Sequence, residues 1–220
     1  MAERWVTFDC YGTLVDWNGG IGAELGRLLG EEHRNELLAR YHEVEPRIQA
    51  EQPSLLYRDV TALALERLAG EQGAELALGE RDALARSLPE WPVFPEVPSA
   101  LEEARSRGFR LCILSNSDPD LIEASMGRIG VPFDDAITAS EIGSYKPDHG
   151  HWRAFTDRHG RLPDVHVGAS LFHDIGPATE LGIPSVWVNR LAEERGGYRP
   201  SREIANLAPL PDALDELAGA

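Results

Sequence analysis

The chain is poor in cysteine and has no long hydrophobic run. It contains two cysteines, Cys10 and Cys112, which excludes a disulfide framework and favours a reducing compartment. No apolar stretch approaches the roughly 18 residues that a membrane-spanning helix needs. Met1-Ala2-Glu3-Arg4 leads into a short strand pattern, which is not typical of a secretory signal. We therefore expect a cytoplasmic protein with no membrane partner.

Basic residues are also scarce. The sequence has 37 acidic and 21 basic residues, so the formal net charge is −16. A surface of this sign repels nucleic-acid phosphates and anionic membranes, which excludes nucleic acid as a partner. It also makes any local Arg or Lys informative, because a small anionic substrate would need one.

One stretch near the start combines a strand with reactive side chains. The β-forming residues Trp5, Val6 and Phe8 predict a short buried strand. Asp9 follows where the apolar run stops, and Gly12-Thr13 comes soon after. In open α/β sheets ligands bind beyond the carboxyl ends of the strands, so Asp9 is a candidate catalytic residue.

Two kinds of pattern divide the chain. Residues 17–90 show helical spacing without a strand, which is too long for one crossover and predicts an inserted helical lid. Residues 1–16 and 91–220 alternate strands with helices. One of these helices begins at Pro119, with Asp118 as its expected cap. The predicted fold class is therefore α/β: a doubly wound parallel-sheet core with an all-helical cap.

Polar residues gather where the predicted core strands end. They are Asp9 and Thr13, then Ser115-Asn116, then Lys146, and finally Asp174 after Ser170. The sheet topology would bring all of them to one rim. A carboxylate nucleophile, hydroxyl donors, an ammonium and a second carboxylate can together carry out covalent catalysis through an aspartyl ester.

This ordered set resembles the haloacid dehalogenase superfamily. The four motifs of that superfamily match Asp9 to Thr13, Ser115, Lys146-Pro147 and Asp174. Residues 8–14, 114–116 and 145–148 look most like the L-2-haloacid dehalogenase branch. The resemblance covers nearly the whole chain and implies a Rossmann-like core, with the helical insert as its cap.

Tyr11 distinguishes two branches of the superfamily. Its phosphatases carry a second Asp at this position, which protonates the leaving alkoxide and helps to hold magnesium. An alkoxide benefits from a general acid, whereas a halide leaves without a proton. The fourth motif also supplies one acid, Asp174, where phosphatases usually supply two. We therefore expect carbon–halogen cleavage without a required metal or cofactor.

The resemblance implies a role for each site residue. Asp9 attacks C2 of a small 2-haloalkanoic acid, and water positioned by Asp174 near Lys146 hydrolyses the ester. Thr13 and Ser115 donate hydrogen bonds to carboxylates. A lid arginine, best matched by Arg40 with Arg47 or Arg58 as alternatives, binds the halide together with Asn116. The residues predicted to contact the substrate are Tyr11, Arg40, Ser115, Asn116, Trp152 and Ser170.

The fourth motif leaves alternatives open. Ala169 and Leu171 stand where the dehalogenases have a serine and an asparagine. A related metal-free hydrolase of another small acid would show the same residues. A Mg²⁺-dependent phosphatase and a non-catalytic binding protein are further alternatives. His173 is either a general base or a contact to the lid. The resembled branch is often dimeric through its lid helices, so a homodimer is an open expectation.

Overall fold

A six-stranded parallel sheet forms the centre of the larger part of the molecule. The computed structural model describes residues 3–219. The strand order is β3-β2-β1-β4-β5-β6, and every neighbouring pair is parallel. The strands are β1 (Arg4–Phe8), β2 (Phe109–Ser115), β3 (Asp135–Thr138), β4 (Val165–Gly168), β5 (Ser185–Val188) and β6 (Arg202–Ile204). The winding reverses beside β1, so the predicted doubly wound sheet is confirmed and a crevice opens at the ends of β1 and β4.

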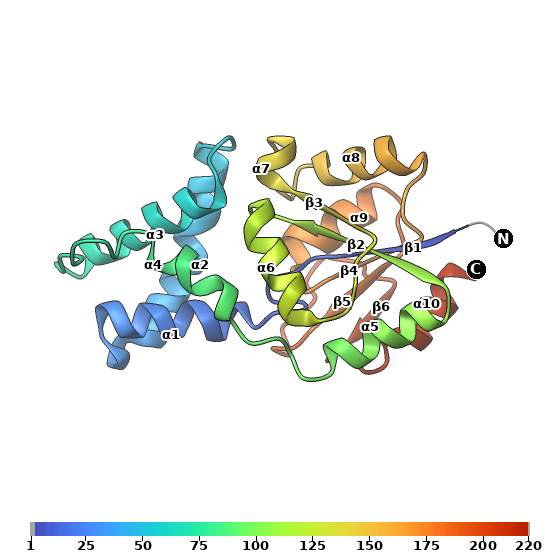
Figure 1. The fold of residues 1–220 in the computed structure, drawn as a ribbon, viewed down its shortest axis with the longest axis horizontal. Helices are drawn as coiled ribbons and strands as arrows, with labels where there is room; N and C mark the ends of the chain where they lie inside the picture. Colours follow the sequence, from blue (N-terminus) through green and yellow to red (C-terminus); the bar gives the residue numbers. More distant parts are fainter. Residues whose placement is uncertain (1–2, 220) are drawn as a thin grey trace.

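Alternation along the strands buries both faces of the sheet. Phe8 and Ile113 belong to one hydrophobic cluster, which the helices α5 (Val97–Ser106), α6 (Pro119–Ile129) and α10 (Leu210–Ala218) cover. Trp5 and Leu114 belong to the other cluster, which α8 (Gly150–His159) and α9 (Gly176–Glu180) cover. Successive side chains of a strand point to opposite faces, so such a sheet needs helices on both sides. Figure 1 shows α8 above the strands and α5 and α10 below them.

Residues 17–90 form a separate group of helices at the carboxyl-end side of the sheet, drawn in blue and green in Figure 1. The group contains α1 (Trp17–Leu29), η1 (Glu31–His33), α2 (Arg34–Glu51), α3 (Tyr57–Glu71), α4 (Ala83–Ser87) and η2 (Leu88–Glu90). All described strands lie outside it. The division into a core of residues 1–16 and 91–220 and a cap of residues 17–90 is our interpretation of this arrangement.

The two chain segments that join the cap to the core run side by side. Val15 bridges Val93 in the antiparallel sense. The backbone N–H of Asp16 donates to Pro92 O at 2.8 Å, and that of Phe94 donates to Leu14 O at 3.1 Å. This narrow ribbon is the covalent connection between the cap and the core. None of the helices in residues 3–219 is long and apolar enough to cross a membrane.

Asp118 does not cap α6 as predicted. Its side chain accepts no hydrogen bond from the first turn of that helix. It accepts instead from the backbone N–H groups of Tyr57 and Arg58, at 2.9 and 3.1 Å, where α3 begins. Arg58 Nε adds a third bond at 3.1 Å. A core carboxylate thus caps a helix of the cap, satisfying N–H groups that have no partner within α3.

Candidate active site

Lys146 joins two carboxylates at the carboxyl edge of the sheet. Lys146 Nζ donates to Asp9 Oδ1 at 2.9 Å, to Asp174 Oδ1 at 2.7 Å and to Leu114 O at 2.9 Å. An ammonium has three protons, so its donors are fully used. Lys146 is the chain's only lysine. The side chains of Lys146 and Asp174 are 1% and 0% exposed and that of Asp9 is 13% exposed, so Asp9 is the accessible member of the three.

The loop after β1 holds Asp9 in a fixed orientation. Thr13 Oγ1 donates to Asp9 Oδ2 at 2.8 Å and accepts from the backbone N–H of Ala169 at 2.9 Å. Gly12 has a φ of +89°, which glycine adopts without the steric cost other residues have. The backbone N–H of Asp9 donates to Val167 O at 2.9 Å. Hydrogen bonds from the loop after β1, from β4 and from the segment after β4 therefore place Asp9 at the crevice.

Asp174 is held by the segment that follows β4. The backbone N–H of Ser170 donates to Asp174 Oδ2 at 3.1 Å, and His166 Nε2 lies 3.4 Å from Asp174 Oδ1. Residues Leu171–Ile175 form a π-helical turn, η3. Ser170 caps this turn by accepting from the backbone N–H of His173 at 3.0 Å. Such π-helical turns often occur at functional sites.

The pKa values of the two carboxylates are shifted in opposite directions. Burial raises the pKa of Asp174, but Lys146 and His166 outweigh burial and hold it below the usual range. Burial, with the nearby Asp174 charge, raises the pKa of Asp9 against the opposing effect of Lys146. Burial lowers the pKa of Lys146, yet the two carboxylates outweigh that effect and raise it. The ammonium therefore stays charged and Asp174 stays ionised at neutral pH.

A cavity of about 300 Å³ lies between these residues and the cap. Its core wall includes Asp9, Lys146 and Asp174, and the buried Ser115 lines it with a hydroxyl that has no protein partner. The cap wall consists of side chains from three helices, namely Trp17, His42, Glu45, Pro46, Gln49 and Tyr57. A cavity of this size, with polar and charged groups converging on it, is typical of a small-molecule site.

Several predicted site residues meet at this cavity. Tyr11, Ser115, Asn116 and Ser170 all line it. The Tyr11 ring stacks on Tyr57 with centroids 6.4 Å apart, while its hydroxyl lies 3.0 Å from Ser125 Oγ. Tyr11 therefore offers its ring, and not its hydroxyl, to the cavity.

Asn116 binds the backbone of Lys146. Asn116 Nδ2 donates to Lys146 O at 2.9 Å, and Asn116 Oδ1 accepts from the backbone N–H of Lys146. One Nδ2 proton remains for a ligand. The amide thus fixes Lys146 and keeps limited capacity to bind a leaving group.

The prediction that Arg40 binds the leaving group is wrong. Arg40 lies outside the cavity, where its guanidinium pairs with Glu43 and Glu71. An α-helix turns about 100° per residue, so Arg40 lies on the side of α2 opposite His42. The alternatives do not line the cavity either: Arg47 is exposed, and Arg58 pairs with Asp118 and Asp120.

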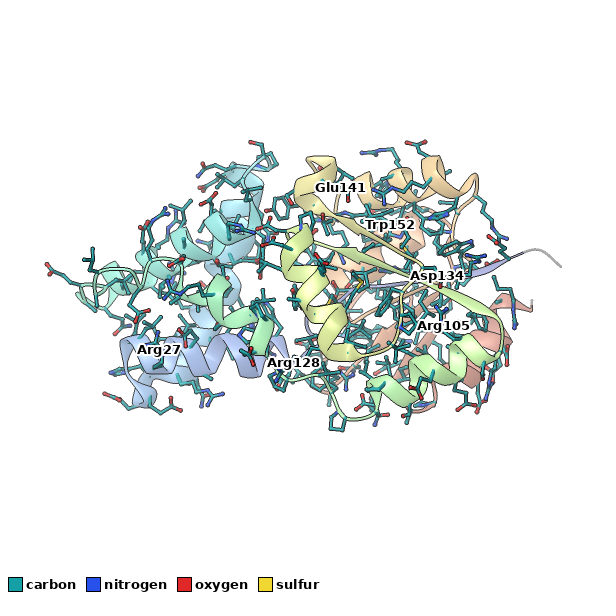
Figure 2. The ribbon with its side chains drawn as sticks, viewed as in Figure 1. Arg27, Arg105, Arg128, Asp134, Glu141 and Trp152 are labelled. Atoms are coloured by element: carbon teal, nitrogen blue, oxygen red, sulfur yellow. The ribbon has the colours of Figure 1, made fainter. Side chains whose placement is uncertain are left out.

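The prediction that Trp152 contacts the substrate is also wrong. Trp152 is fully buried in the cluster beneath α8 and does not line the cavity. Its ring packs edge-on against His166 with centroids 5.1 Å apart. Figure 2 shows it among the core elements, away from the cap helices. Trp152 therefore supports His166, which in turn approaches Asp174.

Sequence reasoning missed two groups of residues. His166 is buried between Thr7 Oγ1, 2.9 Å from its Nδ1, and the Asp174 carboxylate. Nothing in a β-strand sequence marks such a histidine. The cap residues His42, Glu45 and Gln49 recur every three to four positions, which places them on one face of α2. The helical spacing of these three polar residues was the feature of the sequence that could have identified the cap wall of the cavity.

The donor set does not fit the magnesium of the superfamily's phosphatases. Lys146 Nζ already lies between Asp9 and Asp174. Tyr11 replaces the second aspartate of the phosphatases, whereas Mg²⁺ requires near-ideal octahedral oxygen coordination. Within residues 3–219 there is no cluster of three or more His, Cys, Asp or Glu residues suited to a metal ion. The mechanism below therefore includes no metal step.

Comparison with known proteins agrees with this geometry. The (S)-2-haloacid dehalogenase of Pseudomonas sp. (strain YL) is 28% identical, over 97% of this chain and 95% of that protein. The phosphoserine phosphatase of Thermus thermophilus is 33% identical, over 62% of this chain and 53% of that protein. The match to the dehalogenase thus extends through both cap and core.

Solved structures and a family model extend the comparison. The crystal structure of an L-2-haloacid dehalogenase superimposes with a TM-score of 0.86 at 23% identity, covering 98% of this chain and 100% of that chain, which shows the shared fold. The family model described as haloacid dehalogenase-like hydrolase matches residues 3–182. The chain therefore belongs to the haloacid dehalogenase-like hydrolases.

Proposed function

We propose that this enzyme hydrolyses the carbon–halogen bond of a small 2-haloalkanoic acid through an ester on Asp9, without a metal or other cofactor. The observation that carries the proposal is the position of Asp9, the accessible carboxylate of a lysine-bridged pair, on the wall of a cavity between core and cap. The near full-length similarity to (S)-2-haloacid dehalogenases supports this reaction. Two free, buried cysteines agree with a cytoplasmic enzyme.

The first step forms the ester. Asp9 attacks C2 of the substrate, and the electron pair of the carbon–halogen bond leaves with the halide. Ser115 Oγ, which is buried and has no protein partner, donates to the substrate carboxylate. Thr13 keeps the other oxygen of Asp9 in place. Holding the reactants in line in this way removes much of the entropic barrier to displacement.

The second step releases the product. Water attacks the carbonyl carbon of the Asp9 ester and transfers one proton to Asp174. The bond from that carbon to the substrate oxygen breaks, and the departing oxygen takes the second proton of the water. The 2-hydroxy acid leaves with an oxygen that came from Asp9, and Asp9 keeps an oxygen from water. Asp174 then returns its proton to solvent, so the net reaction consumes one water and yields one halide and one proton.

Halide release tests the proposal against its alternatives. We expect the wild type to release chloride from one enantiomer of 2-chloropropanoate, with or without a chelator, and Asp9→Asn to release none. Asp16→Asn, which alters a cap-helix N-terminus without touching the cavity, is a matched control and should remain active. Phosphate release from phosphoserine that a chelator stops would instead establish the phosphatase.

A further inference from the structure

A buried glutamate forms part of the cap wall. Glu45 on α2 lines the cavity and is 7% exposed. Gln49 Nε2, one turn further along the helix, donates to Glu45 Oε1. Glu45 Oε2 has no hydrogen-bond partner within residues 3–219. The Gln49 bond thus occupies one oxygen of the carboxyl group and leaves the other for a ligand.

No cation compensates Glu45. Of the described residues, no arginine lines the cavity, and the lining ammonium of Lys146 already serves Asp9 and Asp174. Burial raises the pKa of Glu45 to about 8. Glu45 is therefore neutral at pH 7, and with Oε1 accepting from Gln49 its proton lies on Oε2.

Other titratable groups lie near Glu45 or line the same cavity. They are Tyr41, His42, Tyr57, Tyr145, His173 and Glu193. Burial raises the tyrosine pKa values and lowers those of the two histidines. Neither kind gains or loses charge near pH 8. Glu193 is exposed at the rim, and the Asp9–Lys146–Asp174 set is internally paired.

We propose that Glu45 donates a hydrogen bond from its carboxyl O–H to the departing halide. In-line attack by Asp9 from the core wall directs the leaving group toward the cap wall, on which Glu45 lies. Negative charge grows on the halide as its bond to C2 breaks, and a preorganised donor stabilises that charge. Glu45 keeps its proton throughout, so the balance of the reaction is unchanged.

The proposed hydrogen bond from Glu45 rests on the proposed function and adds to it, because it determines which halides the enzyme can release. A neutral donor helps a small, basic halide more than a large, weakly basic one, so fluoride depends on it more than bromide does. The site should therefore accept 2-fluoroalkanoic acids as well as chloro and bromo acids. Two cap arginines, Arg40 and Arg58, are held in ion pairs outside the cavity.

A series of leaving groups and pH values tests the role. The variants are Glu45→Gln and Glu45→Ala, with the exposed Glu51→Gln at the end of the same helix as a control. The substrates are 2-fluoro-, 2-chloro- and 2-bromopropanoate. We expect wild-type kcat/KM to fall above about pH 8, and Glu45→Gln to abolish that fall because its amide cannot ionise.

The size of the effect should depend on the halide. Glu45→Ala should lower kcat on the fluoro acid by about 10²-fold and on the bromo acid by less than about 10-fold. Glu45→Gln should retain part of the activity and Glu51→Gln all of it. An equal loss on all three halides, with the wild-type alkaline limb retained in Glu45→Gln, would show that Glu45 only supports the structure.

Infrared spectroscopy separates this inference from the proposed reaction. Wild type at neutral pH should show the carbonyl stretch of a protonated carboxylic acid that Glu45→Gln lacks, and added bromide should shift it. A band that bromide leaves unmoved would overturn the halide contact. An enzyme that releases no halide from any of the acids, yet shows the bromide-sensitive band, would instead contradict the proposed function.

Discussion

Lys146 connects the nucleophile to its partner carboxylate, and its loss should affect both stability and activity. Lys146→Gln leaves two buried carboxylates together without a counter-charge. Removing one partner from a buried ionic set typically costs about 3–5 kcal/mol. We expect the free energy of unfolding in urea to fall by that order at pH 7 and kcat for halide release to fall by roughly 10³-fold.

The control for this variant is Arg110→Gln, which removes an exposed pair with Glu3 and a longer contact of 3.6 Å to Asp134. Exposed pairs contribute about 0–1 kcal/mol, so its unfolding curve should stay close to that of the wild type. A Lys146→Gln protein as stable and as active as this control would contradict the role assigned to the ammonium.

The acid limb of the pH–rate profile reports on Asp9. Asp9 must be ionised to attack, and burial raises its pKa above 3.8. Activity should therefore be lost as pH falls through a value higher than that of an ordinary aspartate. In Lys146→Gln the limb should move to still higher pH, because the cation that favours the carboxylate is gone. A wild-type limb at or below 3.8 would be inconsistent with this environment.

A substitution at Gly168 tests whether ester hydrolysis depends on the position of the Asp174 carboxylate. A Cβ on Gly168 would approach the Asp174 carboxyl carbon to 2.4 Å, which requires the carboxylate to move. We expect Gly168→Ala to weaken the contacts to Lys146 and Ser170 and to lower the rate of ester hydrolysis more than the rate of ester formation. Accumulation of the Asp9 ester, followed by mass spectrometry, would show this.

A matched control for Gly168 is Gly127 on α6. An added Cβ meets nothing within 4 Å at that position. Gly127→Ala should therefore hydrolyse the ester as fast as the wild type. Equal ester levels in the two variants would contradict the claim that Gly168 leaves room for Asp174.

At the scale of elements, the first turn of α3 depends on a carboxylate from the core. Asp118→Ala leaves the N–H groups of Tyr57 and Arg58 without their acceptor. Loss of a helix cap costs about 0.5–2 kcal/mol. We expect amide hydrogen exchange at these two residues to accelerate by about 10-fold while the sheet stays protected.

Asp120→Asn provides the comparison, since it alters the exposed contact to Arg58 and leaves the Asp118 cap intact. Exchange at the start of α3 should change little in this variant. Unchanged exchange in Asp118→Ala as well would mean that α3 is held by its apolar packing alone.

Element prediction succeeded where burial produced a clear pattern. The strand at Trp5, Val6 and Phe8 was predictable because it is a short apolar run in the core. β6 was missed because two of its three residues are exposed. Asp118 is followed by Pro119, a typical helix start, yet its carboxylate turns to α3. Local sequence cannot show which of two helix ends a side chain will reach.

The residues of the cap wall were also not predictable from local sequence. Motif position pointed to Arg40, but the phase of α2 turns that residue to solvent and presents His42, Glu45 and Gln49 to the cavity. The phase depends on how α2 packs against α1 and α3, which is a long-range property. Residues at strand ends were predictable because a parallel sheet brings them to one edge.

For the whole molecule, the cavity combines a core wall with a cap wall that differs in chemistry. The core wall supplies the nucleophile and its ionic partners, whereas the cap wall supplies neutral hydrogen-bonding groups and aromatic rings. A ribbon at residues 14–16 and 92–94 joins the two. In the reaction we propose, attack depends on the core wall and the choice of leaving group depends on the cap wall. A homodimer remains a prediction.

The central claim is that Asp9 becomes covalently attached to the substrate and is freed by water. A single turnover of 2-chloropropanoate in H₂¹⁸O, with enzyme in excess, tests it through mass spectrometry of the Asp9 peptide. We predict that ¹⁸O appears in Asp9 and not in the 2-hydroxy acid. Label in the product with none in Asp9 would mean that water attacks C2 directly, and would contradict the account.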